Sequence, residues 1–363
     1  MLEKGRISAF QMAMMLYPTV LATGFLVLPT ITAEYAQNDF WMTGLLTIIT
    51  GFVTIYVAVR LHELYPNENV IQHSQRIVGT TLGRLTGVIF FLYSIHGTGT
   101  SVRVYAEFVK INFLFKTPIL MIISTMVLLV SFTVRAGLET MGRSAVIFTP
   151  VFITPLLFLL LLIPDLDFRN ILPVLSHGIV PVLQGTATPQ AWVSELFFMT
   201  FFLPCLSDPD KGRTWGNRVL GAIVLSMVFV SLIILFLLGS DTVDKTYPVL
   251  VAFRYINTGD FLENLEALLL AMWIVGSFVK ISVFLYVAVL SFAQTLRLSD
   301  YRPFVFPLGF LAILFSLWDL PSYVRLGTHF RYAAPFEIPA VLLLIPMLLL
   351  IIDRLRRIMT KRR

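Results

Sequence analysis

Ten hydrophobic stretches, each long enough to cross a lipid bilayer, dominate this chain and leave little room for any other kind of fold. A helix needs about 20 apolar residues to span the roughly 30 Å of hydrocarbon in a bilayer. Hydrophobic residues make up 57% of the 363 residues and charged residues only 13%, which is typical of a multi-pass membrane protein. The sequence therefore predicts an all-α membrane protein whose residues 1–363 form a single integral membrane domain. Its ten transmembrane helices are centred near Ala22, Thr50, Leu92, Val127, Ile153, Phe198, Val228, Gly276, Ala312 and Pro346.

Lysine and arginine are unevenly distributed between the predicted loops. With both termini in the cytoplasm, 18 of the 27 basic residues fall on the cytoplasmic side and 7 on the other, which leaves Arg103 and Lys280 at membrane depth. Cytoplasmic loops retain positive charge, so this bias predicts cytoplasmic N- and C-termini. The net charge of +6 is concentrated in the basic tail 354–363, and we interpret it as a topology signal instead of a nucleic-acid site.

The ten predicted spans divide into two sets of five, about residues 8–163 and 188–356, on either side of an outer loop of about residues 164–187. Because each half holds an odd number of spans, two halves of the same fold must be inverted relative to each other in the membrane. Three connections are long enough to hold helices of their own. We expect an amphipathic helix at the cytoplasmic face in residues 65–84, a short helix around Val180–Gln184, and a short apolar element covering a central pathway in residues 241–261.

The first span of each half carries helix-breaking residues. LYPTVLATGFLVLPT in the first span contains Pro18, Gly24 and Pro29, and SELFFMTFFLPCLSDPDK in the sixth contains Pro204. Paired interruptions in corresponding helices predict a transporter-type binding site at the bilayer midplane, because unwound backbone leaves N–H and C=O groups free to hold a ligand. The alternative is that they are proline kinks without a functional role, which membrane helices tolerate.

Several segments along the chain resemble one known family. The resemblance lies in EKGRISAFQ, TGFLVLP, ENVIQHSQRIVGTTLGR, NILPVLSHGIVPVLQGT, SELFF and FVKISVFLYVAVLSFAQTLRLSDYR. Together they resemble the B subunits of GerA-type spore germinant receptors, over essentially the whole chain. That family is similar to permeases of the amino acid, polyamine and organocation superfamily, which have the five-plus-five inverted repeat of the leucine-transporter fold with helices 1 and 6 broken.

The resemblance implies a biological setting that the residues alone do not. Such proteins lie in the inner membrane of dormant bacterial spores, sense small nutrient germinants, and work with an A subunit and a lipoprotein C subunit. The expected function is a nutrient-sensing receptor subunit that binds a small germinant, such as an amino acid. The alternative is a proton-coupled secondary transporter of amino acids or similar solutes, because alternating access requires the same broken helices.

Two charged residues within the predicted spans are candidates for ion or proton coupling. Lys280 lies deep in the eighth span, where a lysine must face the bundle interior and be paired or neutral. It stands either as an internal cation where related transporters place sodium, as a proton-responsive amine, or as a structural lysine paired with a carboxylate. Glu195 opens the apolar part of the sixth span near the outer edge of the cavity, either as a partner of Lys280 or as a solvated interfacial carboxylate.

The ligand site is expected where spans one, three, six and eight meet. Tyr93, Gly97 and Ser101 share one face of span three, which either lines a cavity or permits close helix packing. Arg103 and Glu107 are expected to form an ion pair, and His96 to be a packed or interfacial residue. The predicted ligand-binding residues are Thr23, Gly24, Phe25, Tyr93, Gly97, Phe198, Thr200, Phe201 and Ser282.

Enzymatic and metal chemistry are not indicated. Cys205 is the only cysteine, and the five histidines have no metal-ligand spacing. Nucleophile and base do not occur at productive spacing. We therefore expect no catalytic residues, no metal and no cofactor.

Overall fold

The computed structural model describes residues 2–256 and 265–361; within these ranges its regular structure consists of helices joined by turns and loops, with an isolated bridge between Ile7 and Leu206. The last residues of the predicted 241–261 segment and the end of the basic tail lie outside the described residues. The helices of the first half are α1 Ala9–Ala36, α2 Trp41–Leu64, α3 Val70–Val78, α4 Thr80–Asn112, α5 Ile119–Ala136 and α6 Leu138–Phe158. The second half contains α7 Ile179–Val193, α8 Met199–Phe202, α9 Gly212–Leu238, α10 Pro248–Tyr255, α11 Glu266–Thr295, α12 Val305–Trp318, α13 Tyr323–Thr328, α14 Ala334–Pro339 and α15 Ile345–Lys361.

Seven helical segments among the described residues are long and apolar enough to cross a membrane. The helix α4, the interrupted α7–α8 segment and the short helix α12 are not among the seven. The count of ten spans stays a prediction. The seven segments are Ala9–Asp39, Trp41–Leu64, Ile119–Ala136, Leu138–Asp165, Pro209–Asp244, Glu266–Thr295 and Tyr323–Met359.

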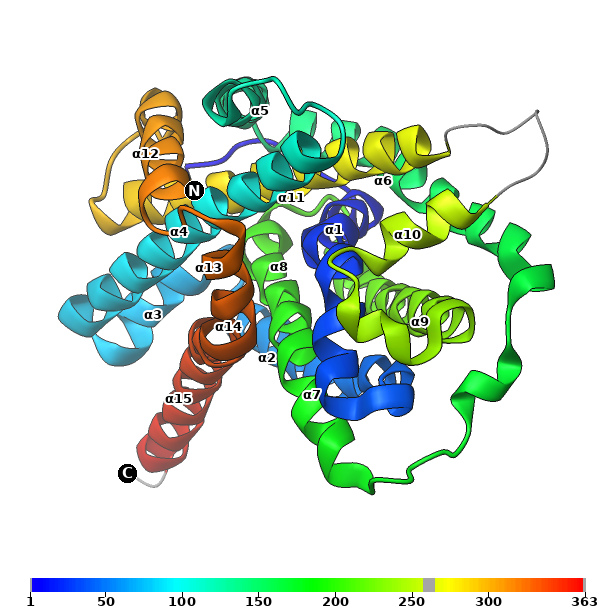
Figure 1. The fold of residues 1–363 in the computed structure, drawn as a ribbon. Helices are drawn as coiled ribbons and strands as arrows, with labels where there is room; N and C mark the ends of the chain where they lie inside the picture. Colours follow the sequence, from blue (N-terminus) through cyan, green and yellow to red (C-terminus); the bar gives the residue numbers. More distant parts are fainter. Residues whose placement is uncertain (1, 257–264, 362–363) are drawn as a thin grey trace.

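The helix α1 lies at the centre of the molecule. It packs against α6, α7, α9 and α11 (Figure 1). Almost all of its side chains are buried. Its start is fixed by a capping box, in which the Ser8 hydroxyl accepts from the Gln11 N–H and the Gln11 side chain accepts from the Ser8 N–H. A helix that is apolar on all sides belongs in the interior of a bundle. This position makes α1 a wall of every cavity described below.

The predicted break in the first span is wrong, because α1 is one continuous helix with Pro18 and Pro29 inside it. A proline removes one N–H donor and frees the carbonyl four residues before it. For Pro18 that carbonyl belongs to Met14, and it accepts a hydrogen bond of 2.7 Å from the Thr149 hydroxyl of α6. A neighbouring helix therefore satisfies the backbone group that the proline leaves free, and the helix continues.

The sixth span is interrupted. Its α-helix α7 ends at Val193, and a 3-10 turn, Ser194–Phe198, precedes the single turn of α8 and a second 3-10 turn, Leu203–Cys205. The first change of helix type thus lies at Ser194, ten residues before the Pro204 that suggested it. The short loop helix predicted at Val180–Gln184 is instead the first turn of α7, so this span begins inside the predicted outer loop.

Two predicted loop helices and one predicted ion pair are present, and the last span contains two π-helical turns. The predicted helix in residues 65–84 is present as α3, which packs against α4 and α15, and the predicted apolar element of the second long loop is α10, which contacts α1, α9 and α11. The last span is a single path in which π-helical turns at His329–Ala333 and Ala340–Leu344 separate α13, α14 and α15 (Figure 1). Such π turns occur frequently at functional sites. The predicted ion pair in α4 is confirmed, with Arg103 Nε 2.9 Å from Glu107 Oε1.

Candidate ligand site

A buried ion pair joins the interrupted sixth span to α11. Lys280 Nζ lies 2.9 and 3.1 Å from the two carboxylate oxygens of Glu195, and both side chains are 2% exposed. The same amine donates to the Thr23 hydroxyl of α1 at 3.1 Å. A charge at this depth requires a close partner, since removal from water is costly. The pair therefore ties together three helices that are remote in the sequence.

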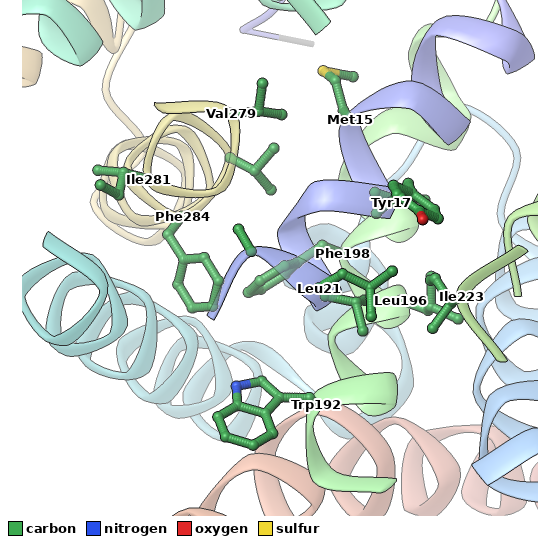
Figure 2. Close-up of a cluster of buried hydrophobic side chains, with 14 of the residues drawn as sticks. Met15, Tyr17, Leu21, Trp192, Leu196, Phe198, Ile223, Val279, Ile281 and Phe284 are labelled. Carbon is green, nitrogen blue, oxygen red and sulfur yellow. The ribbon is translucent and has the colours of Figure 1, made fainter. Parts of the chain in front are cut away.

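Aromatic rings cover one side of this pair. Lys280 Nζ lies 5.3 Å from the ring centroid of Phe284, which follows it by one turn of α11. The Phe284 ring meets Phe198 edge to face at a centroid distance of 4.8 Å, and Tyr93 of α4 lies 6.2 Å from Phe284. Figure 2 shows Phe284 extending from α11 toward Phe198 across α1. The rings form a low-dielectric wall that strengthens the electrostatic interactions of the amine.

The pair opens onto a cavity of roughly 390 Å³ between α1, α4, the sixth span, α11 and the last span. Its lining combines apolar walls with a few convergent polar groups, as the linings of small-molecule sites do. Its polar groups are hydroxyls, two imidazoles, two carboxylates and one amine. The lining residues are Thr23, Tyr93, His96, Gly97, Thr100, Ser101, Trp192, Glu195, Lys280, Phe284, His329, Phe330, Glu337 and Ile338.

Five of the residues singled out from the sequence come together at this cavity, namely Thr23, Tyr93, Gly97, Glu195 and Lys280. Ser101 joins Tyr93 and Gly97, so the polar face of α4 lines the cavity along two turns. Close packing is present as well, because a Cβ added at Gly97 would lie 2.4 Å from the Phe284 ring. Glu195 lies in the interior of the bundle, not near the outer edge where it was expected.

The other predicted ligand residues lie elsewhere. Gly24 and Phe25 point to a different face of α1 and line a separate apolar cavity of roughly 310 Å³ between α1, α2, α7 and α9. Ser282 lines a third pocket, and its hydroxyl donates to the Phe278 carbonyl at 2.7 Å. Because α1 is a continuous helix, neighbouring residues point in different directions and a run such as 23–25 cannot face one ligand.

The predicted ligand residues of the sixth span also do not line the cavity. Phe198 lies behind the Phe284 ring, and Thr200 and Phe201 are buried in α8. Phe201 packs on Phe90 of α4 at a centroid distance of 6.2 Å. The residues of this span that do line the cavity are Trp192 and Glu195, one turn apart on one face.

The sequence interpretation did not assign three ionisable residues to the cavity that the structure places there. His329 and Glu337 belong to the last span, and His96, expected only to pack or lie at an interface, faces both. His96 Nε2 lies 2.6 Å from Asp319 Oδ2, and its Nδ1 lies 3.5 Å from Glu337 Oε1. An ionisable residue such as Glu337 within an apolar span is itself a sign of a functional site, and this signal was available in the sequence.

The two ends of the bundle are held by polar contacts. On one side, Ile7 N–H donates to the Cys205 carbonyl at 3.1 Å, and the first N–H of α1 donates to Asp208 Oδ1 at 2.7 Å. On the other side, Arg331 Nε donates to Glu34 Oε2 at 2.7 Å. A further cavity of roughly 440 Å³ lies between α1, α4, α10 and α13, and Phe330 lines both this cavity and the candidate site.

Solved structures that are similar to this chain include transporters of the leucine-transporter fold. A Na+-coupled sialic acid symporter in a substrate-bound outward-open state matches with a TM-score of 0.68 and 11% identity, over 93% of this chain and 79% of that one. MhsT in complex with L-phenylalanine matches with a TM-score of 0.69 and 14% identity, over 95% of this chain and 89% of that one. At these identities the similarity establishes the fold.

Sequence relatives point to one family. The chain is 28% identical to spore germination protein YndE of Bacillus subtilis (strain 168), over 97% of both chains. It is 25% identical to spore germination protein KB of the same organism, over 87% of this chain and 86% of the relative. A family model described as "Spore germination protein" matches residues 6–324. The chain therefore belongs to the spore germination protein family, the family of the B subunits of GerA-type germinant receptors.

Proposed function

We propose that this protein is the nutrient-sensing subunit of a spore germinant receptor, and that it binds a small germinant, an amino acid, in the cavity beside the Lys280–Glu195 pair. Germination is then triggered through partner subunits, a receptor A subunit and a lipoprotein C subunit. The protein acts as a binding protein and not as an enzyme. Its family membership and transporter-type fold support this proposal.

The observation that carries the proposal is the chemistry of the cavity at the interrupted sixth span. A zwitterionic amino acid needs a cation for its carboxylate and an anion for its ammonium group. The cavity offers the amine of Lys280 on one wall and the carboxylates of Glu195 and Glu337 on others, with hydroxyls of Thr23 and Ser101 between apolar rings.

Ligand binding is transmitted by a shift between conformations. The cavity is formed by five elements that meet only in the folded bundle, namely α1, α4, the sixth span, α11 and the last span. A ligand that contacts all five binds better when they are closed around it. This differential affinity is the only requirement for a population shift that partner subunits detect.

We further infer that the protein resides in the inner membrane of the spore with both termini in the cytoplasm, and that residues 8–163 and 188–356 form two inverted repeats. Contacts at one end of the bundle support the shared side of the termini. Leu2 borders a groove with Glu68 and Gln72 at α3, and Arg356 of α15 donates to the Ile77 carbonyl of α3. The beginning and the end of the chain thus lie beside the same amphipathic helix.

A second candidate function is proton-coupled transport of an amino acid or similar solute. The buried amine of Lys280 supports it, because a titratable pair at the ligand cavity provides a coupling group for a proton. The transporter folds of the solved relatives also suit it. In that case Lys280 and Glu195 exchange partners during each cycle, whereas in a receptor they change only with ligand occupancy.

Binding to the purified protein tests the proposed site. Radiolabelled L-alanine, L-valine and L-proline are equilibrated with the full-length protein in detergent, and the change Thr23→Val is compared with wild type. Valine keeps the shape of threonine but removes the hydroxyl that faces Lys280. We expect at least tenfold weaker binding of whichever amino acid binds wild type. The hydrogen bond lost would be the one between the Thr23 hydroxyl and a charged group of the ligand, and such a bond is worth about 1.5–3 kcal/mol. Unchanged affinity would exclude this cavity.

Transport and sensing are separated by two further measurements. Protein reconstituted in liposomes under an imposed pH gradient is expected not to accumulate the labelled amino acid, and accumulation above empty liposomes would favour the transporter. Spores lacking the protein are expected to lose their response to one class of nutrient and to keep the others. An unchanged response to every nutrient would contradict the receptor assignment.

A further inference from the structure

A second cluster, made of two imidazoles and two carboxylates, borders the candidate ligand cavity. His96 of α4 stands at its centre, between Asp319 at the end of α12 and Glu337 of α14. His329 of the π-helical turn lies beside it, with ring centroids 5.5 Å apart and its Nε2 4.0 Å from Glu337 Oε2. Four separate elements thus converge on one imidazole.

The geometry around His96 indicates which of its two ring nitrogens carry a proton. Its Nε2 is 2.6 Å from an Asp319 oxygen, so this nitrogen carries a hydrogen and donates it. In a neutral imidazole the other nitrogen is then an acceptor, and its lone pair would point at the Glu337 carboxylate 3.5 Å away. Two acceptors facing each other repel. The arrangement is satisfied only when an additional proton lies between His96 and Glu337.

Other charged groups near the cluster already have partners. Lys280 and Glu195 neutralise each other. Arg331, in the same π-helical turn as His329, pairs with Glu34 of α1. An imidazole between two carboxylates is a site that a proton can occupy.

The cluster joins α4 to the turn between α12 and α13 and to α14. Arg103, two turns after His96 on α4, donates to the Ser316 carbonyl at 3.2 Å and to the Pro321 carbonyl at 2.5 Å, so a permanent cation anchors the turn between α12 and α13. His96 adds a second anchor on the same turn through Asp319, and extends it to α14 through Glu337. Of these contacts, only the one between His96 and Glu337 depends on the additional proton.

The position of Phe330 gives the anchor a consequence for access to the site. This ring follows His329 directly, lines both the candidate ligand cavity and the neighbouring cavity, and packs on Trp192 at a centroid distance of 5.3 Å. When α13 and α14 are held against α4, Phe330 separates the two cavities. When the anchor is released, the π-helical turn and its ring are free to shift.

We propose that His96, Asp319 and Glu337 form a proton-binding latch that closes the last span over the ligand cavity, so that ligand binding is linked to uptake of a proton. The linkage rests on the proposed function, because it assumes a ligand in this cavity. The latch itself does not, because it follows from the cluster alone. Protonation holds Phe330 in place and retains the ligand, and loss of the proton opens the passage between the cavities.

Trp192 is a built-in reporter of the latch because its indole packs on Phe330. The test is a pH titration of tryptophan emission from the full-length protein in detergent between about pH 5 and pH 8, the range in which histidine titrates. The contribution of Trp192 is the signal that disappears in Trp192→Phe. We expect a single one-proton transition in wild type. The matched control is His177→Gln, which removes an exposed histidine remote from the cavity and should keep that transition.

The informative variant is Glu337→Gln, which keeps the size of the side chain and supplies an amide N–H to His96. This change makes the contact independent of the proton, so Trp192 emission should stay at its low-pH value throughout. A second variant, His96→Gln, should also abolish the transition. A wild-type signal that does not change with pH, or a transition that persists in Glu337→Gln, would overturn the latch.

Binding of radiolabelled L-alanine, L-valine and L-proline is measured over the same pH range. Wild-type affinity for whichever of these binds should fall as pH rises, by up to about tenfold per pH unit for one linked proton, and should be constant in Glu337→Gln. A wild-type affinity that is flat or rises with pH would overturn the linkage. If none of the three binds while the Trp192 transition is present in wild type and absent in Glu337→Gln, the latch stands and the proposed ligand site fails.

Discussion

Replacing Lys280 by methionine is the sharpest perturbation that this structure offers. Methionine fills a similar volume but removes the amine, and Glu195 is then left with a buried carboxylate that is 2% exposed. Both of its oxygens lose a donor, at 3.1 and 2.9 Å, and the Thr23 hydroxyl loses a third contact. Removing one member of a buried ion pair destabilises a protein by about 3–5 kcal/mol.

The magnitude converts into a measurable shift of the melting temperature. With an unfolding entropy of about 2.1 cal/mol/K per residue, 1 kcal/mol corresponds to about 1.3 °C for this chain of 363 residues, so Lys280→Met should melt roughly 4–7 °C below wild type. The assay is thermal unfolding of the purified protein in detergent, with retention of monodisperse protein in size-exclusion chromatography as the readout. Near-ultraviolet circular dichroism before heating confirms that each variant starts folded.

The double variant Lys280→Met with Glu195→Leu provides the control. It replaces the pair by apolar groups of similar size, which is often neutral or even stabilising in a buried site. We expect it to recover most of the stability lost in Lys280→Met while binding no ligand. The reasoning would be refuted if the single variant melted like wild type, or if the double variant were less stable than the single one.

Three other changes address separate parts of the molecule. Gly97→Ala should lower the free energy of unfolding by about 1–3 kcal/mol, since the new Cβ would lie 2.4 Å from the Phe284 ring. Denaturant unfolding in mixed micelles measures this change, and an unchanged midpoint would contradict the prediction. Burial lowers the pKa of His73 in α3 to about 3, below its usual 6.5, so the unfolded chain binds a proton that the folded one excludes, and stability should fall as pH decreases from about 6.5 toward 3. The variant His73→Gln should weaken this pH dependence of stability, and a profile identical to that of wild type would argue against the explanation. Asp208→Ala removes the acceptor for the first N–H of α1, and this hydrogen bond is worth about 1 kcal/mol. Maleimide should therefore label buried Cys205 about fivefold faster than in wild type. An unaltered labelling rate would show that this contact does not hold the end of the bundle closed.

The helical architecture followed from hydropathy because the bilayer imposes a fixed length and forbids unsatisfied backbone groups. The interruption of the sixth span also had a sequence signal in Pro204, although the change of helix type begins earlier, near Glu195. The same reasoning failed for α1. Whether a proline breaks a helix depends on the group that meets the freed carbonyl, and here Thr149 does so from a helix 135 residues away.

The candidate site was predictable in part, from two of its ionisable residues. Lys280 and Glu195 were recognisable because a charge within an apolar span has few structural explanations. Their contact was not, since 85 residues separate them. Glycine and phenylalanine carry no comparable signal, because each occurs throughout the bundle, and this is why Gly24 and Phe201 were assigned to a cavity that they do not line.

The sequence by itself determined that this chain is a bundle of membrane helices, which helices carry helix-breaking residues, and which charges must be buried. These are local properties, because length, hydropathy and backbone chemistry act residue by residue. Only the tertiary structure decided that Thr23, Glu195 and Lys280 meet, and that His96 lies between Asp319 and Glu337. Such contacts depend on the rotation of each helix about its axis, and that rotation is set by packing against all neighbouring helices at once.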